Sequence, residues 1–363
     1  MSNTERTITF KDLLEQKTWT DYGDFVSEAN ELLSKEVENH IKEEKELIYE
    51  LKQNPIFKKL RIKSVNERLP EAEELLLEGN VVGVDGTKAD YRLISGLRTQ
   101  IGVVAVNYMG DKIRKSFFIS EANLKNKSLD VIERISGRAL HDETLSDMAV
   151  RGLMLYRERE AGLDPKFNGK YVMFHGPLLP FELMSGLGRL RALDSTLDIL
   201  RKIIREKRFF SVISSTSFQD YLTFGRAIEP MQYLTAQEYT FGHYLENESN
   251  FLTWKDKWRD DERKKVEEFI RDYAEKIYIG VIRIGDRPYV FHAHEDTFDL
   301  AASIIARDSL FQKQKGFPLL IDYADALCSQ YFRAGDFRGI MEWELAKKGA
   351  YLAEAPERDL RLK

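Results

Sequence analysis

The sequence is poor in cysteine, in long apolar runs and in signal-like features. Cys328 is the only cysteine among 363 residues, so no disulfide can form within the chain, and its apolar neighbours favour a buried, inert thiol over a nucleophile. No run approaches the ~20 apolar residues that span a bilayer, and the first residues are polar rather than basic and then apolar. We therefore expect a cytoplasmic protein without a membrane segment.

An excess of positive charge is also missing. Lysine and arginine number 55 against 60 aspartates and glutamates, which gives a formal net charge of -5 and argues against a surface that binds nucleic acid everywhere. Basic residues cluster at 58–63, 112–115 and 201–208, but each cluster alone is more typical of a solvated face than of a phosphate track. Any DNA site must be local.

Several enzyme signatures are absent from the sequence. It has no Walker A motif, no Gly-x-Gly-x-x-Gly after a strand, no Cys-x-x-Cys, no His-Glu-x-x-His and no Gly-x-Ser-x-Gly. With 43% hydrophobic and 32% charged residues, the composition is nevertheless that of a folded globular protein.

Apolar patterning predicts a helical N-terminal region followed by an α/β core. Residues 25–53 carry apolar side chains at near-helical spacing, which indicates a long helix or a helical hairpin, either packed across the core or free for a partner. The next predicted elements are strands at 81–85, 100–108 and 113–119, a helix at about 144–162 and a strand at 171–174. Their order, β-β-β-α-β, is that of an RNase H-like sheet.

The rest of the chain continues the alternation of helices and strands. We predict a helix at 187–207, a strand at 209–214, a helical segment at 254–277, a hairpin from 278–284 and 289–292, a helix at 298–307 and a strand-to-helix unit at 317–333. No repeat or low-complexity linker interrupts them. The predicted organisation is an N-terminal helical region, residues 1–75, and one α/β domain, residues 76–363, with a mixed central sheet flanked by helices and a helical insertion near 235–277.

Asp85 is the first candidate for chemistry. It ends an apolar strand and precedes Gly86, so its carboxylate is expected to project where the chain turns at the sheet edge. Phosphodiester cleavage uses divalent ions, and Mg²⁺ or Mn²⁺ takes oxygen ligands. An Asp-Gly pair after a strand is also an ordinary turn, so this position alone leaves both interpretations open.

Three segments resemble motifs of the NurA nuclease family. Val82–Thr87 is similar to that family's hydrophobic-Asp-Gly-Ser/Thr strand, Phe174–Leu179 to its Asp-Gly-Ser/Pro-Leu strand, and Gly316–Asp325 to its closing Gly-Tyr-Pro segment. They occur in the family's order and span about residues 80–335. The resemblance implies an RNase H-like fold and a homodimeric, Mn²⁺- or Mg²⁺-dependent DNA nuclease that degrades DNA ends with a HerA-type hexameric ATPase.

The same resemblance implies a set of metal ligands. Asp85 takes the first position, and His175 stands where the family has a second aspartate. Imidazole is a softer ligand for Mn²⁺ than carboxylate is. The family's helix glutamate corresponds to Glu158 or Glu160. Helical phase favours Glu160 and spacing before the strand favours Glu158, so the sequence leaves both as candidates.

The closing segment departs from the family at one position. Phe317 replaces a tyrosine, which removes a hydroxyl that could contact phosphate, while Asp325 occupies the family's histidine-or-aspartate position. Asp325 could bind metal, orient water or cap a helix that begins there. Elsewhere, His292 and His294 share one face of a strand, but no third ligand accompanies them in sequence.

Two functions follow as hypotheses. The first is the metal-dependent nuclease, acting with its translocase in DNA repair or in defence against invading DNA. The second is a catalytically degraded RNase H-like adaptor that regulates the partner ATPase, an alternative favoured by His175 and Phe317. Metal-dependent stabilisation of the folded protein discriminates between them.

Overall fold

The computed structural model describes residues 22–93, 96–120, 140–214, 219–247 and 258–349. It divides into two compact units, Met1–Lys58 and Lys59–Lys363. The expected boundary after residue 75 differs from this division, because the residues after Lys58 belong to the larger unit. None of the described helices has both the length and the apolar content that crossing a bilayer requires.

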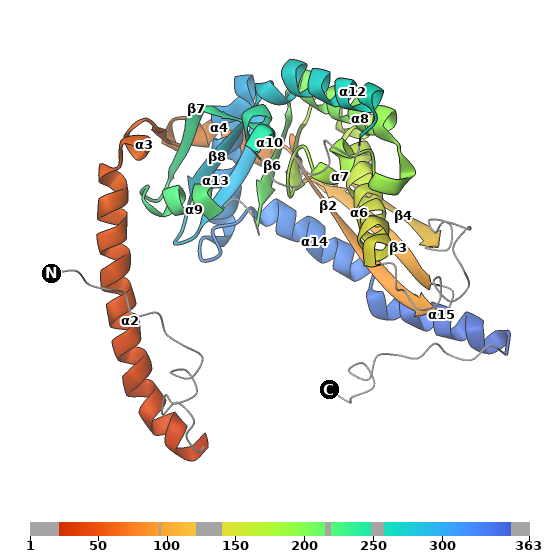
Figure 1. The fold of residues 1–363 in the computed structure, drawn as a ribbon, viewed down its shortest axis with the longest axis horizontal. Helices are drawn as coiled ribbons and strands as arrows, with labels where there is room; N and C mark the ends of the chain where they lie inside the picture. The colour runs from red at the N-terminus through yellow and green to blue at the C-terminus, as the bar shows by residue number, and fades with distance from the viewer. Residues whose placement is uncertain (1–21, 94–95, 121–139, 215–218, 248–257, 350–363) are drawn as a thin grey trace. The chain divides into compact units, whose positions relative to one another are not determined.

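The smaller unit contains one long helix. Helix α2 (Tyr22–Gln53) is continuous and is followed by the short helix α3 (Pro55–Lys58), so the described part of this region is a single helix rather than a hairpin (Figure 1). Asn54 separates the two helices: its side-chain oxygen accepts a hydrogen bond from the Ile56 N–H at 2.8 Å. Several apolar side chains of α2 are exposed, among them Leu33, Val37 and Leu47.

A mixed sheet of nine strands forms the centre of the larger unit, in the order β1-β7-β8-β9-β6-β5-β2-β3-β4. Among the described strand pairs, β2–β5 and β5–β6 are parallel and the others are antiparallel. The strands are β1 (Arg61–Ser64), β2 (Val81–Leu93), β3 (Gly96–Val106), β4 (Lys112–Ser120), β5 (Tyr171–His175), β6 (Phe209–Ile213), β7 (Gln232–Thr240), β8 (Ile277–Arg283) and β9 (Pro288–His294). The predicted α/β class with a mixed central sheet is confirmed.

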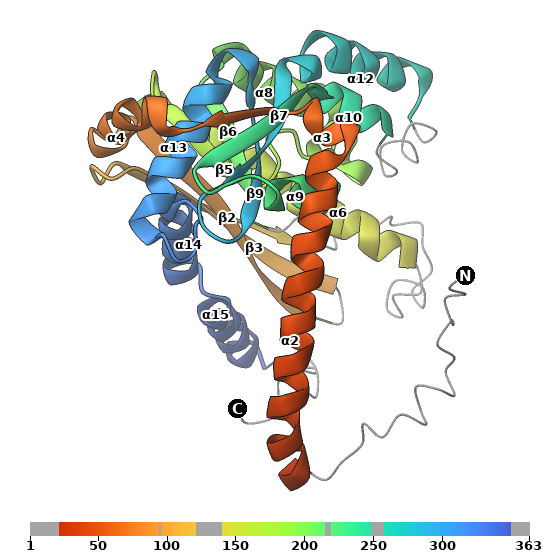
Figure 2. The ribbon, with the colours of Figure 1, turned by 90° about the vertical axis from the view of Figure 1, so that its left-hand side faces the viewer.

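Helices cover both faces of this sheet. Figure 2 shows α13 and α14 on one face and α6, α9 and α10 on the other. The helices of the larger unit are α4 (Leu69–Leu77), α6 (Leu140–Gly162), α7 (Phe181–Met184), α8 (Leu193–Glu206), α9 (Gln219–Arg226), α10 (Phe241–Asn247), α12 (Asp260–Asp272), α13 (Phe298–Ser309), α14 (Leu319–Tyr331) and α15 (Ala334–Lys347).

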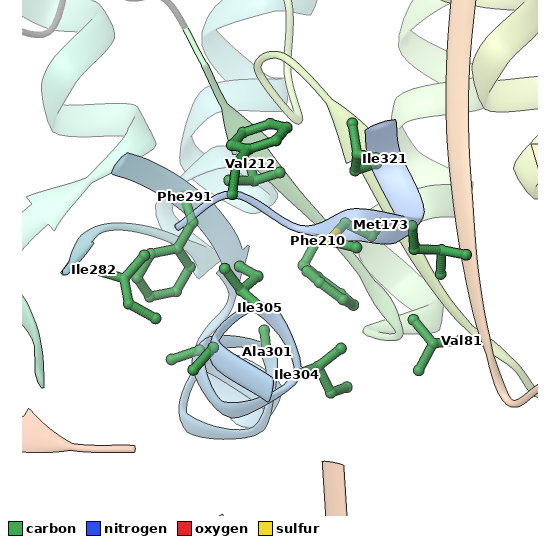
Figure 3. Close-up of a cluster of buried hydrophobic side chains, with 14 of the residues drawn as sticks. Val81, Met173, Phe210, Val212, Ile282, Phe291, Ala301, Ile304, Ile305 and Ile321 are labelled. Carbon is green, nitrogen blue, oxygen red and sulfur yellow. The ribbon is translucent and has the colours of Figure 1, made fainter. Parts of the chain in front are cut away.

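The main apolar core lies between the sheet and helix α13. Figure 3 shows Ile304 and Ile305 of α13 directed toward strand residues that include Met173 and Phe210, and all four side chains are buried. Fully burying a side chain of this size contributes about 1.5–3 kcal/mol, so this layer holds the central strands in place. Strands β2, β5 and β6 are anchored by it, through Val81, Met173 and Phe210.

Asp308, at the end of α13, fixes the start of α14. Its carboxylate accepts a hydrogen bond from the Leu320 N–H at 2.9 Å and another from the Tyr108 hydroxyl. Burial raises the pKa of Asp308 to about 6, although both hydrogen bonds oppose the rise. This carboxylate satisfies a backbone donor that a helix N-terminus otherwise leaves unpaired, and it sets the position of the helix that carries Asp325.

Some elements differ from the sequence predictions. Strands β1 and β7 were not predicted, because all four side chains of β1 are exposed at the sheet edge and β7 carries several polar residues. The strand predicted to begin at Phe317 is wrong: this residue is buried just before α14, and Pro318 precedes the helix. The insertion expected near 235–277 contains most of β7 with α10 and α12, and residues 248–257 lie outside the described part.

Candidate active site

Asp85 and His175 lie side by side on two parallel strands, at the point where β5 ends and β2 continues. The register of β2 and β5 pairs Val84 with Phe174, which makes Asp85 and His175 the next residues on each strand. Asp85 Oδ1 is 3.3 Å from His175 Nδ1 and also accepts the Gly86 N–H at 2.9 Å. Burial opposes protonation of His175, but Asp85, with Glu158 and Asp325, raises its pKa above the ordinary value.

The turn expected after Asp85 is wrong, because β2 continues through Gly86 and beyond the end of its neighbour β5. β5 ends at His175, whereas β2 extends to Leu93, so from Asp85 onward β2 has passed the end of β5. Successive residues of β2 point to opposite faces of the sheet. Gly83 faces Leu320 of α14, and Gly86 faces Glu158 of α6 on the other side. At this point side chains from both helical layers can approach Asp85.

Glu158 approaches the strand end from α6. A Cβ atom on Gly86 would lie 2.6 Å from Glu158 Oε1, so this close approach requires glycine at position 86. Burial raises the pKa of Glu158 to about 8; Arg159 opposes the rise and Asp85 adds to it. A buried carboxylate that also feels the charge of Asp85 is therefore costly to ionise without a nearby cation.

Arg159 is the neighbouring buried cation. Its guanidinium lies 2.6 Å from Glu158 Oε2, donates to the Pro177 carbonyl oxygen at 2.5 Å and stacks 4.6 Å from the Phe174 ring centre. These contacts tie α6 to the end of β5. Glu158 Oε2 is thereby engaged, and Oε1 is the oxygen directed at Gly86.

The structure distinguishes the two helix glutamates. Glu160 forms an ion pair with Arg157 and is much more exposed than Glu158, which is buried against β2. The helical phase favoured Glu160, but the buried face of α6 includes the charged residues Glu158 and Arg159. Glu158 is therefore the glutamate that lies against β2.

Asp325 and Phe317 approach the pair from the opposite side. Asp325 is exposed on α14, seven positions into the helix, so the expectation that it caps the helix start is wrong. Partial desolvation by neighbouring groups, followed by the charge of Asp85, raises the pKa of Asp325. The Phe317 ring packs against the His175 ring edge-on, with 5.8 Å between centres. Cys328, buried as predicted, donates its thiol to the Asp85 carbonyl oxygen at 3.3 Å.

Ser214 is a neighbour of His175 that the sequence reasoning missed. It follows β6, and its Oγ lies 2.8 Å from His175 Nε2. The only sequence signal is its place directly after an apolar segment. The structure shows that this segment is β6, which runs parallel to β5. His292 and His294, by contrast, are buried in β9, and their Nδ1 atoms accept backbone N–H groups of Leu178 and Asp296. This placement makes them structural.

The donor set suits a hard divalent cation, although its members are not arranged as a complete shell. Asp85 and Glu158 supply carboxylate oxygens and His175 an imidazole nitrogen, and Mn²⁺ accepts both kinds of ligand. Over the described ranges, no three His, Cys, Asp or Glu side chains already form a metal-holding group. Asp85 and His175 are the assembled pair, and Glu158 is the third candidate.

Comparison with known proteins gives a likeness in structure only. No protein-family model and no curated protein sequence matches the chain. Among solved structures, the NurA nuclease from Sulfolobus solfataricus is 10% identical with a TM-score of 0.43, over 78% of this chain and 95% of that one. A NurA structure with manganese is 11% identical with a TM-score of 0.41, over 68% of this chain and 92% of that one. A NurA structure bound to dAMP and manganese is 11% identical with a TM-score of 0.42, over 72% of this chain and 89% of that one.

Proposed function

We propose that this chain is a divalent-metal-dependent DNA nuclease whose site is built by Asp85, His175 and Glu158. The observation that carries the proposal is the contact between Asp85, within β2, and His175, at the end of β5, with Glu158 buried beside Gly86. The three sequence motifs that resemble NurA nucleases converge on this position. Buried carboxylates grouped in this way are typical of functional sites.

The electrostatics of the site support a bound cation. Desolvation raises the pKa of both Glu158 and Asp325, and the charge of Asp85 raises each further, so the carboxylates destabilise one another's charged forms. Arg159 offsets the charge of Glu158, and His175, when protonated, offsets that of Asp85. A divalent cation removes this repulsion and favours the ionised carboxylates that bind it.

Each side chain has a role in this proposal. Asp85 and His175 hold Mn²⁺ or Mg²⁺, and Glu158 contributes Oε1 while Arg159 fixes its other oxygen. When bound, the ion supplies positive charge that stabilises the negative charge developing on a phosphodiester. Asp325, exposed and with a raised pKa, orients the attacking water and accepts its proton.

The proposed partners are DNA, a second copy of the chain and a HerA-type hexameric ATPase. The net charge of -5 is compatible with a nuclease that receives DNA from a translocating ring, since the ring supplies much of the affinity. Exposed apolar residues of α2, including Leu33, Val37 and Leu47, offer a contact surface for either protein partner. DNA repair and defence against invading DNA are both consistent with this activity.

A second candidate is the catalytically degraded adaptor. Two observations favour it: Glu158 is already paired with Arg159, and Phe317 packs on the His175 ring where the resembled family has a tyrosine. An adaptor predicts no specific Mn²⁺ site. Measuring the unfolding temperature with and without Mn²⁺ separates the two functions, because binding to the native state alone raises stability.

The deciding experiment replaces Asp85. Asp85→Asn is expected to lower Mn²⁺-supported degradation of linear DNA by orders of magnitude, because about 1.4 kcal/mol of lost transition-state stabilisation is tenfold in rate. Asp90→Asn is the matched control, since Asp90 lies on the same strand but binds Thr99 and Lys88 instead. If the parent protein shows no metal-dependent cutting of DNA, even with its translocase and ATP, the nuclease proposal fails and the adaptor function takes its place.

A further inference from the structure

His175 is held through both of its ring nitrogens. Nδ1 is 3.3 Å from Asp85 Oδ1 on β2, and Nε2 is 2.8 Å from Ser214 Oγ, just after β6. β5 lies between β2 and β6 and is parallel to both, so three neighbouring strands bring a carboxylate, an imidazole and a hydroxyl into one line. The shorter contact is with Ser214.

The position of Ser214 is itself fixed by the backbone. The Gly176 N–H donates to the Val212 carbonyl oxygen at 2.9 Å, which keeps the ends of β5 and β6 together. Arg287 donates to the Ser214 carbonyl oxygen at 3.0 Å, from the turn between β8 and β9. Phe317 covers the edge of the imidazole ring. The ring therefore has little freedom to rotate while these contacts persist.

A histidine that binds metal through one nitrogen must carry its proton on the other, and that proton needs an acceptor. Nδ1 faces Asp85, the first proposed ligand, and Nε2 faces away from it toward Ser214. A hydroxyl can accept a hydrogen bond as well as donate one, so Ser214 suits this task.

We propose that Ser214 is a positioning residue for His175: its hydroxyl accepts the Nε2–H and so presents the Nδ1 lone pair, beside Asp85, to the metal. The inference rests on the proposed nuclease function, because it assigns the orientation of one of that site's ligands. Ser214 touches neither the metal nor DNA in this arrangement. It acts only through His175.

The test compares Ser214→Ala, Ser214→Thr and Ser211→Ala. Threonine keeps the hydroxyl, and Ser211 lies on β6, three residues before Ser214, where its buried hydroxyl makes no hydrogen bond to His175. The dissociation constant for Mn²⁺ is measured from the electron paramagnetic resonance of free Mn²⁺, and spin-echo modulation reports a directly bound nitrogen. We expect Ser214→Ala to weaken Mn²⁺ binding by about 10- to 100-fold, whereas Ser214→Thr and Ser211→Ala remain near the parent.

The outcomes separate this inference from the proposed function. If Ser214→Ala, folded by its melting curve, binds Mn²⁺ as the parent does, the positioning role is overturned and the nuclease proposal stands. Mn²⁺ binding without nitrogen modulation in the parent also overturns it, since His175 is then not a ligand. Absence of Mn²⁺ binding in the parent defeats both.

A rival hypothesis assigns Asp85, His175 and Ser214 to a catalytic triad. Carboxylate, imidazole and hydroxyl in this order also occur in serine hydrolases, where the hydroxyl is the nucleophile. Covalent labelling of Ser214 by a fluorophosphonate probe, abolished in both Ser214→Ala and a His175→Ala variant, would overturn the positioning role. Absence of labelling together with the expected loss of Mn²⁺ affinity supports it.

Discussion

Gly86 on β2 and Glu158 on α6 are in such close contact that a single methyl group cannot fit between them: a Cβ on Gly86 would lie 2.6 Å from Glu158 Oε1. Met154, one turn earlier on α6, would also be only 2.9 Å away. The helix and the strand end are therefore packed to the limit that the backbone allows. The position of the candidate ligand depends on a residue without a side chain.

Gly86→Ala is accordingly expected to displace Glu158 and to weaken both Mn²⁺ binding and DNA cleavage by at least about tenfold, the usual lower effect of disturbing a ligand's support. Gly339→Ala is the control, because no atom lies within 4 Å of its added Cβ and it sits within α15. That variant should be neutral or gain up to about 1 kcal/mol. Equal Mn²⁺ affinity in both variants would remove Glu158 from the site.

His175→Asp tests whether the imidazole is a ligand that a carboxylate can replace. The new carboxylate would face Asp85, so we expect a lower unfolding temperature without metal and a larger rise on adding Mn²⁺ than in the parent. DNA cleavage should be kept or increased, whereas His175→Ala should lower it. Identical cleavage rates in all three proteins would show that position 175 takes no part.

Arg159→Leu tests the buried ion pair with Glu158. Removing one partner of a fully buried pair leaves an uncompensated charge, and the expected loss of stability is about 3–5 kcal/mol. Arg151→Leu is the matched control on the same helix, since Arg151 pairs with Glu182 but is mostly exposed, and its loss should cost less than about 1 kcal/mol. Chemical denaturation measures both. Mn²⁺ should recover part of the loss in Arg159→Leu only, because it replaces the missing positive charge.

His292 makes stability depend on pH. Burial lowers the pKa of His292 to about 3 in the folded protein, against an ordinary value near 6.5. Between these values the unfolded state binds a proton that the folded state does not, so this residue favours unfolding increasingly as pH falls from about 6.5 toward 3. His292→Asn should remove up to about 1.4 kcal/mol per pH unit from the slope in that window.

The comparison must be made as a difference between the two proteins. Asp308 has a raised folded pKa of about 6, so its contribution is present at low pH and is lost as pH rises from about 4 to 6, opposite to that of His292. Denaturant titrations of parent and His292→Asn at several pH values cancel the Asp308 effect. Parallel stability curves for the two proteins would contradict a neutral, buried His292.

The sequence could predict the meeting of Asp85 and His175 because both residues follow apolar strand segments within motifs. It could not predict Ser214, because a serine after a strand is common and its contact depends on β6 being next to β5. The choice of Glu158 required the structure, since a charged residue on the buried face of α6 breaks the amphipathic pattern. Edge strand β1 escaped detection for the reason that an edge strand need not bury side chains.

The part of β2 beyond Asp85 belongs to a different apolar cluster from the part before it. Val81 packs in the main core with α13 and α14, whereas Ala89 and Tyr91 pack with Phe337 of α15 in a separate, smaller cluster. Local unfolding of the smaller cluster should cost less free energy than local unfolding of the main core. Amide hydrogens of β2 residues in the smaller cluster should therefore exchange with solvent faster than those of the central strands. Asp85 lies between the two clusters along β2 and pairs with Val104 of the main core, so its amide is expected to exchange more slowly than those of residues 89–91.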